Sequence, residues 1–231
     1  MSNRPERYIQ LANQYEPEGI HLTLPFEGDV VLLQGWGDNP EIHAQLTYNG
    51  VPLKGHPGLD FLLPAGSAVL SVDAGRVVEI SNEPGGFGRY VKLEHRWGES
   101  LYAHLGELQV EAGQRVDRGR KLGATELVTR GYPPHLHLAI RLAPYNRLDG
   151  WGGFSDPLPY LYMSEPITSV PDPSENSEHP QPAAFPPMLQ ERPGIRRLPD
   201  RLDRAVDAVF AEQVAGARSQ ADAIHDFSVA L

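Results

Sequence analysis

Residues 135–142 read His-Leu-His-Leu-Ala-Ile-Arg-Leu, and this stretch decides the expected fold. Apolar side chains recur at every second position, which is typical of a β-strand with two different faces. One face carries Leu136, Leu138, Ile140 and Leu142, and the other carries His135, His137, Ala139 and Arg141. Residues i and i+2 of a strand project to the same side, about 6–7 Å apart at the backbone. The two histidines are therefore expected to lie side by side.

Other short runs in the same part of the chain also read as strands, separated by glycine turns. They are 30–36, two strands within 68–80, and a pair at 88–97 and 99–108 joined at Gly98-Glu99. Several short strands at this spacing indicate an all-β sandwich or barrel. Residues 63–78 and 110–123 also share an Ala-Gly pattern typical of the corners of barrel-sandwich domains. We therefore expect a mainly β fold with an antiparallel β-sandwich or barrel-sandwich hybrid core.

The composition changes along the chain and predicts four segments. Residues 1–24 form an N-terminal segment, and residues 25–163 form the β-rich domain. Residues 164–199 are proline-rich and are expected to be an extended linker or arm. Residues 200–231 are alanine-rich, with an apolar stripe that predicts an amphipathic C-terminal α-helix. That helix would dock on its own domain or on a partner.

Charge and residue content exclude several classes of function. The formal net charge of −10 argues against nucleic acid as the main partner. The chain has no cysteine, so a metal ion would have to be held by histidine and carboxylate side chains. No apolar run reaches the 18 residues of a transmembrane segment. The first fifteen residues lack an apolar h-region, so we expect no signal peptide there.

Three places in the β-rich region combine histidine or aspartate with turn residues. They contain His56 with Asp60, His104 alone, and His135 with His137. A set of histidine and aspartate side chains suits zinc. Three protein ligands leave a fourth position for water, which is the catalytic rather than the structural arrangement. Taken alone, the two histidines of the 135–142 strand are equally well explained as solvent-facing side chains.

The three motifs together resemble the M23 family of zinc metallopeptidases, the LytM and lysostaphin type of peptidoglycan endopeptidases. The family pattern is H-x-x-x-D, then a single histidine after an aromatic-Ala pair, then H-x-H. In this chain these read HPGLD at 56–60, YAH at 102–104 and HLH at 135–137. The resemblance covers residues 25–163, roughly 60% of the chain.

The resemblance implies a role for each of five residues. His56, Asp60 and His137 would hold one zinc ion per chain, and His104 and His135 would be catalytic histidines that do not bind the metal. Zinc-activated water would then hydrolyse peptide bonds in the stem peptides or cross-bridges of peptidoglycan. The chemistry is consistent, because zinc lowers the pKa of bound water and a neighbouring imidazole can take its proton. A cell-wall substrate would require export by another route, phage-type release or removal of a leader.

The sequence departs from the family pattern in three places. An insertion at 37–55 precedes the first motif and is expected to form a loop at the rim of the groove. Residues 124–134 lack the usual Gly-Asn-Ser-type loop, and Leu138 and Ala139 replace the usual aromatic and acidic residues. These changes bear on specificity more than on metal binding.

Further side chains have a structural and a functional interpretation. We expect His95 to be structural and Arg141 to form a salt bridge at the rim. For His43, in the insertion, a substrate contact or a spare ligand is only the alternative interpretation. Aromatic residues are more often core than groove lining; this applies to Tyr102, Tyr132 and Trp36. Three further histidines are expected to be solvated, namely His21, His179 and His225.

Two other classes of function compete with the enzyme. Some relatives of this fold have lost zinc ligands and act as regulators or scaffolds of cell-wall machinery, but all five positions are intact here. A lipoyl-like carrier would need a lysine at the tip of a hairpin, and no such tip is present in the sequence.

Overall fold

The structure is a computed structural model, and it describes residues 6–11, 19–126, 133–166 and 195–197 of the 231-residue chain. Within these ranges no helix is long and apolar enough to cross a membrane. The predicted C-terminal helix and most of the predicted proline-rich arm lie outside the described residues, together with Tyr132, His179 and His225.

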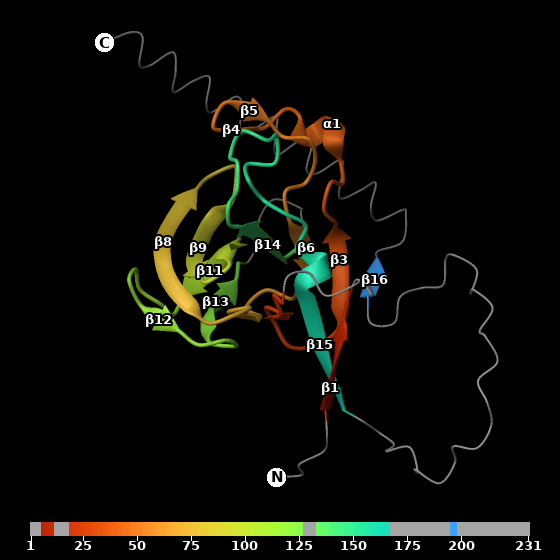
Figure 1. The fold of residues 1–231 in the computed structure, drawn as a ribbon, viewed down its shortest axis with the longest axis vertical. Coiled ribbons are helices and arrows are strands. Elements are labelled where there is room, and N and C mark those ends of the chain that lie inside the picture. The colour runs from red at the N-terminus through yellow and green to blue at the C-terminus, as the bar shows by residue number, and fades with distance from the viewer. Residues whose placement is uncertain (1–5, 12–18, 127–132, 167–194, 198–231) are drawn as a thin grey trace, which may run out of the picture.

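An eight-stranded sheet forms the centre of the molecule (Figure 1). Its strands lie in the order β12-β8-β9-β10-β14-β6-β3-β16, and every neighbouring pair is antiparallel except β16 with β3. The strands are β12 Arg115–Val116, β8 Gly75–Glu83, β9 Gly88–His95, β10 Gly98–Ala103, β14 His135–Leu142, β6 Leu59–Leu62, β3 Val30–Gln34 and β16 Ile195–Arg197. The stretch 135–142 thus lies between β10 and β6, inside the sheet.

Smaller sheets flank the central one. One contains β11 Leu105–Leu108, β13 Lys121–Thr125 and β7 Ala68–Leu70. A second contains β1 Glu6–Gln10, β15 Leu161–Pro166 and β2 Leu22–Thr23, and a 3₁₀ turn, η1 Leu158–Tyr160, precedes β15. The short helix α1 Pro40–His43 and the hairpin of β4 Thr47–Tyr48 and β5 Val51–Pro52 lie together at one end of the molecule (Figure 1). The expected mainly β, largely antiparallel fold is confirmed.

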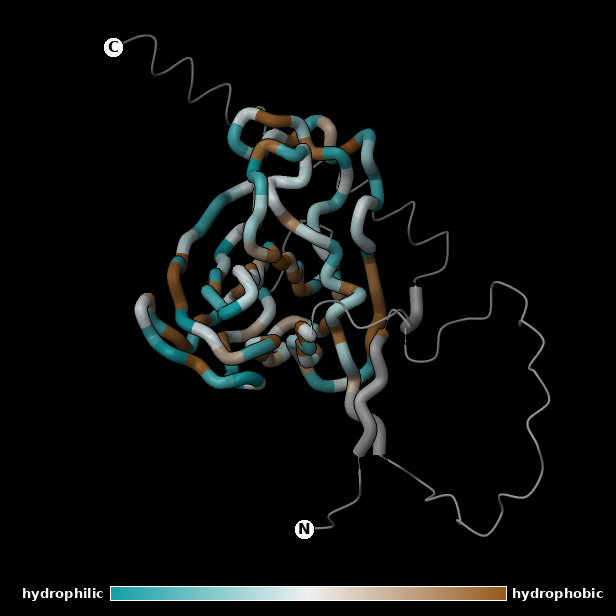
Figure 2. Tube along the Cα trace, in the orientation of Figure 1, coloured by the Kyte–Doolittle hydropathy of each residue, from teal (hydrophilic) through white to brown (hydrophobic). Residues whose placement is uncertain are grey.

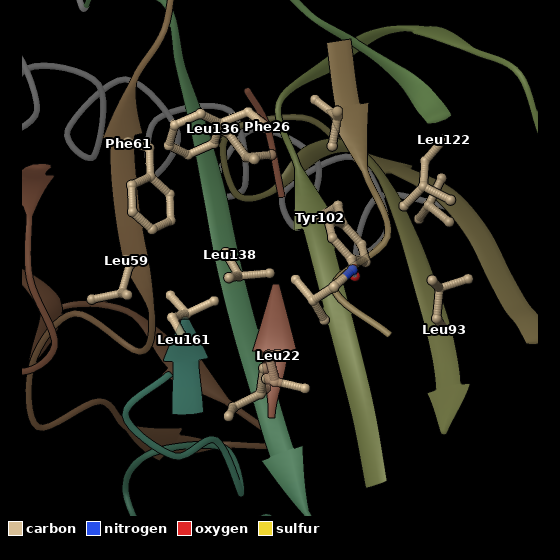
Figure 3. Close-up of a cluster of buried hydrophobic side chains, with 14 of the residues drawn as sticks. Leu22, Phe26, Leu59, Phe61, Leu93, Tyr102, Leu122, Leu136, Leu138 and Leu161 are labelled. Atoms are coloured by element: carbon tan, nitrogen blue, oxygen red, sulfur yellow. The ribbon is translucent and has the colours of Figure 1, made fainter. Parts of the chain in front are cut away.

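One face of the central sheet packs on the main hydrophobic core. Leu136, Leu138 and Ile140 of β14 are fully buried there. Figure 3 shows Leu136 and Leu138 beside Phe61 of β6 and Tyr102 of β10. Figure 2 shows hydrophobic stretches along β3 and the inner strands, with hydrophilic turns at the outside. The predicted alternation of β14 is therefore confirmed, and His135 and His137 point away from this core.

Two local expectations, the position of one turn and the form of the insertion, are wrong. The turn between β9 and β10 is at Arg96-Trp97 rather than at Gly98-Glu99, because Trp97 is buried on the ring of His95 and donates to Asp73. The insertion 37–55 contains α1, β4 and β5 rather than a plain loop. Residues 6–10 pair with β15, and residues 195–197, within the predicted arm, pair with β3.

At Gly98 the backbones of β10 and β14 approach too closely for a side chain. A Cβ at Gly98 would lie 1.8 Å from the carbonyl oxygen of Arg141, and its φ is +145°. We expect Gly98→Ala to destabilise the fold by about 3 kcal/mol, measured by chemical denaturation. Gly113→Ala is the matched control, since its φ is +86° with no atom within 4 Å, and it should cost about 1 kcal/mol. Equal losses for the two variants would contradict the steric explanation.

Candidate metal centre

The pairing of β14 with its neighbours places the first two residues of the site. His137 lies directly opposite Asp60 of β6 and, on the other side, opposite Ala103 of β10. Nδ1 of His137 and Oδ1 of Asp60 are 2.8 Å apart, and both residues are buried. The i, i+2 spacing puts His135 on the same face, one strand step along.

His56 comes from outside the sheet, and the turn at residues 35–38 holds it. The backbone N–H of His56 donates to the carbonyl of Asp38, and the N–H of Gly37 donates to the carbonyl of His56, each at 2.9 Å. The ring Nδ1 of His56 lies 3.1 Å from the carbonyl oxygen of Gly35. Because a carbonyl oxygen can only accept, Nδ1 carries a proton and Nε2 is the nitrogen that faces Asp60 and His137.

Three donor atoms then converge on one point. Nδ1 of His137 lies 2.8 Å from Oδ1 of Asp60 and 3.0 Å from Nε2 of His56. Nε2 of His56 lies 3.2 Å from Oδ1 of Asp60. Ligands about 2.0–2.1 Å from a tetrahedral zinc ion lie about 3.3 Å from one another. A lone pair and a carboxylate oxygen this close also need a cation or a proton between them. The donor set therefore fits a metal ion, and among the described residues it is the one cluster that does.

The electrostatics follow from burial and the shared carboxylate. Burial opposes ionisation of Asp60, but the neighbouring His56 and the hydrogen bonds from both histidines lower its pKa well below the usual value. Burial also opposes protonation of His56, yet Asp60, together with the Gly35 carbonyl and Asp38, outweighs burial and raises the pKa of His56. For His137 burial dominates and lowers the pKa. Asp60 is therefore a carboxylate anion beside the rings of His56 and His137.

His104 and His135 form a second pair beside the first three residues. Their ring centroids are 4.4 Å apart, and the ring of His104 is 6.5 Å from that of His137. His104 directly follows β10 and has φ of +61°, a left-handed conformation that is uncommon outside glycine. Hydrogen bonds to the carbonyl of Phe87 and from the N–H of Glu126 hold this conformation. All five predicted site residues thus lie in one neighbourhood.

Burial favours the neutral forms of the His104 and His135 imidazoles. Burial, followed by the proximity of His135, lowers the pKa of His104 well below its usual value. Burial likewise lowers the pKa of His135. The Nδ1 proton of His135 is donated to the carbonyl of Pro133 at 2.9 Å, which makes Nε2 the basic nitrogen. Neutral imidazoles at this place can accept a proton.

Two other histidines singled out from the sequence, His43 and His95, are not members of the three-residue cluster. His43 is buried and its ring lies 5.3 Å from that of His56; burial together with His56 lowers its pKa to about 3. His95 contacts Ser100 and the carbonyl of Ala74 in a buried network, consistent with a structural role.

Two further expectations about polar side chains are wrong in part. Arg141 does form a salt bridge, to Glu99, but it is fully buried rather than at the rim. His21 is half-buried against Tyr162 rather than solvated. Tyr102 is a core residue, and Trp36 is half-buried against the core.

Sequence reasoning missed the backbone groups that position the candidate ligands. The carbonyl of Gly35 orients His56, and the Asp38 carboxylate accepts the N–H of Gly35 at 2.6 Å. A Cβ at Gly58 would lie 2.7 Å from the His137 ring and 2.6 Å from the carbonyl of Leu138. The glycines of the Gly-Trp-Gly-Asp stretch at 35–38 are the one available signal, since they mark a tight turn just before the first motif.

Comparison with known proteins gives the same picture. Residues 54–148 match the sequence model of Peptidase family M23. The chain is 36% identical over 96 residues to the peptidoglycan DD-endopeptidase ShyA of Vibrio cholerae, covering 40% of this chain and 22% of that protein. It is 35% identical over 91 residues to an uncharacterized metalloprotease of Haemophilus influenzae, covering 39% and 19%.

A solved structure is also similar. The catalytic domain of lysostaphin from Staphylococcus simulans has 26% sequence identity and a TM-score of 0.44, covering 55% of this chain and 88% of that one. The chain spans about a fifth to a quarter of the length of the two curated relatives, ShyA and the metalloprotease of Haemophilus influenzae. The same holds for a third relative, the peptidoglycan DD-endopeptidase ShyB of Vibrio cholerae. The resemblance drawn from the three motifs is confirmed, since residues 54–148 match Peptidase family M23.

Proposed function

We propose that this protein is a zinc-dependent endopeptidase that hydrolyses peptide bonds in the stem peptides or cross-bridges of peptidoglycan. The observation that carries the proposal is the convergence of His56, Asp60 and His137 within 3.2 Å of one another, with His104 and His135 alongside. The named activity of ShyA, a peptidoglycan DD-endopeptidase, supports the substrate class.

In this proposal His56, Asp60 and His137 hold one zinc ion. The metal, when bound, would lower the pKa of a water molecule and polarise the scissile carbonyl. Gly35 fixes the His56 tautomer through its carbonyl, and the β14–β6 register fixes His137 against Asp60. Such outer contacts orient the ligands and raise their affinity for the metal.

His135 and His104 then handle the proton and the developing charge. Nε2 of His135 is the basic nitrogen and takes a proton from the attacking water. His104, held by its left-handed backbone beside His135, is placed to donate a hydrogen bond to the oxyanion. Both imidazoles are neutral at neutral pH, because burial lowers their pKa values. A non-enzymatic regulator would not need these two additional histidines.

Zinc affinity should differ between variants of the two histidines of β14. We expect the wild-type protein to bind one zinc ion and His137→Ala to lose more than about 100-fold in zinc affinity, beyond the 10–100-fold typical of an outer contact. His135→Ala is the matched control from the same strand face and should retain zinc. The measurement is competition with a chromophoric chelator; equal losses for the two variants would contradict the assigned ligands.

Loss of His135 should lower the rate of hydrolysis even though zinc binding is retained. We expect His135→Ala and His104→Ala each to lower kcat by about 10²–10⁴-fold, the usual contribution of general acid–base catalysis. Mass spectrometry of digested peptidoglycan fragments measures the products, and zinc content and circular dichroism confirm loading and fold. Undiminished cleavage by zinc-loaded His135→Ala would overturn its role.

Gly58 gives a test of ligand positioning without removing a ligand. A methyl group there would displace the His137 ring, so Gly58→Ala should weaken zinc binding about 10–100-fold. Gly113→Ala, which meets no neighbour, should leave zinc affinity unchanged. Wild-type affinity in Gly58→Ala would show that the ring has room to move without cost.

A further inference from the structure

The sheet face that carries the site is covered on one side of His137. Beyond His137, the same face continues with Ala139 on β14 and with Ala103 and Leu101 on β10. This face points away from the main core, yet Ala103 and Ala139 are fully buried and Leu101 is 2% exposed. A second hydrophobic cluster, separate from the main core, buries them.

Aromatic rings from three separate segments make this cover. Phe87 precedes β9, Phe154 lies in the segment after β14, and Tyr48 belongs to the insertion. The rings of Phe87 and Phe154 are 6.3 Å apart, and those of Phe154 and Tyr48 are 5.8 Å apart. The row starts at the candidate metal centre, where Phe87 lies 5.3 Å from the ring of His137. We call Tyr48, Phe87 and Phe154 the aromatic wall.

Arg141 fastens two parts of the aromatic wall to the strand that carries the histidines. Its guanidinium lies 4.0 Å from the ring of Phe154 and donates to the hydroxyl of Tyr48 at 2.5 Å. It also donates to Glu99 at 2.9 Å and to the carbonyl of Gly152 at 3.0 Å. A buried cation with this many partners resists displacement, since breaking one contact leaves charge uncompensated.

Backbone and ring contacts join the insertion to the segment after β14 a second time. The N–H of Lys54 donates to the carbonyl of Gly150 at 2.9 Å. Trp36, directly before the insertion, stacks on Trp151, with ring centroids 4.5 Å apart. The cover is therefore connected both to the sheet below it and between its own parts.

We propose that the aromatic wall determines specificity by blocking the sheet face on the Ala139 side of His137, so that the peptide extends only a short distance on one side of the scissile bond. The proposal rests on the proposed function. A peptide running across Ala139 and Leu101 would have to displace Phe154, and with it the contact to Arg141. Ala139 is part of the arrangement, since a long side chain there would occupy the place of the ring.

A first experiment tests the cover without relying on activity. The chain has no cysteine, so Ala139→Cys introduces a single thiol beneath the aromatic wall. With zinc content unchanged, we expect a maleimide to modify it about 100-fold more slowly than the exposed control Ser81→Cys. Adding Phe154→Ala should restore fast modification. Equal rates for Ala139→Cys and Ser81→Cys would overturn the proposal.

A second experiment tests the consequence for substrates. Once a cleaved bond is identified, peptides of that sequence with one to five residues added on either side are compared. We expect the wild-type kcat/KM to fall at least about 10-fold for extension on one side, and Phe154→Ala to recover most of that loss. Leu148→Ala, an exposed residue of the same segment, is the matched control and should keep the wild-type preference.

The outcomes separate this proposal from the proposed function. Absence of any hydrolysis by zinc-loaded wild type contradicts the endopeptidase, while the thiol rates still decide whether the face is covered. Hydrolysis that tolerates extension equally on both sides contradicts the aromatic wall as a specificity element and leaves the endopeptidase standing. If Phe154→Ala proves unstable, Phe87→Ala serves the same comparison.

Discussion

The pairing register of β14 with β6 is the constraint on which the site depends. It sets His137 directly against Asp60, so two of the three candidate ligands meet as a cross-strand pair. A slip of one residue would turn His137 into the main core and a leucine towards the carboxylate. The core prevents that slip, because Leu136, Leu138 and Ile140 are all fully buried on the opposite face. Packing on one side of the strand therefore fixes chemistry on the other.

The third member of the cluster is not fixed by the sheet. His56 precedes β6, and its position depends on backbone hydrogen bonds to the turn at 35–38 and on the carbonyl of Gly35. The close approach is built into the sequence, since a Cβ at Gly55 would lie 2.7 Å from the carbonyl oxygen of Gly37. A buried histidine beside a buried carboxylate is costly unless each polar atom is matched. The turn supplies the hydrogen bond that the sheet cannot.

His137 is positioned by strand pairing and His56 by a distant turn. This difference explains how much of the fold and of the candidate site could be predicted from the sequence. Strand alternation in 135–142 and the H-x-x-x-D and H-x-H spacings are local, so the β fold and four of the five candidate site residues could be predicted from them. His104 stands alone in its segment and is predicted only from the resemblance to the M23 family. The turn at Arg96-Trp97 and the burial of Arg141 depend on contacts between distant segments. Arg141, for example, meets Tyr48, 93 residues away in the chain. No spacing rule within one segment encodes such a contact.

Two of the departures from the family pattern, the insertion and Ala139, belong to the same part of the structure. The insertion contributes Tyr48, the segment after β14 contributes Phe154, and position 139 is an alanine small enough to lie under both. An acidic side chain at 139, the usual family residue, would be buried beneath these rings without a free cation, because Arg141 is already paired with Glu99. The replacement of that acid and the aromatic cover above it are thus two parts of one change. Both alter the surface beside His137 and leave the three converging donor atoms as they are.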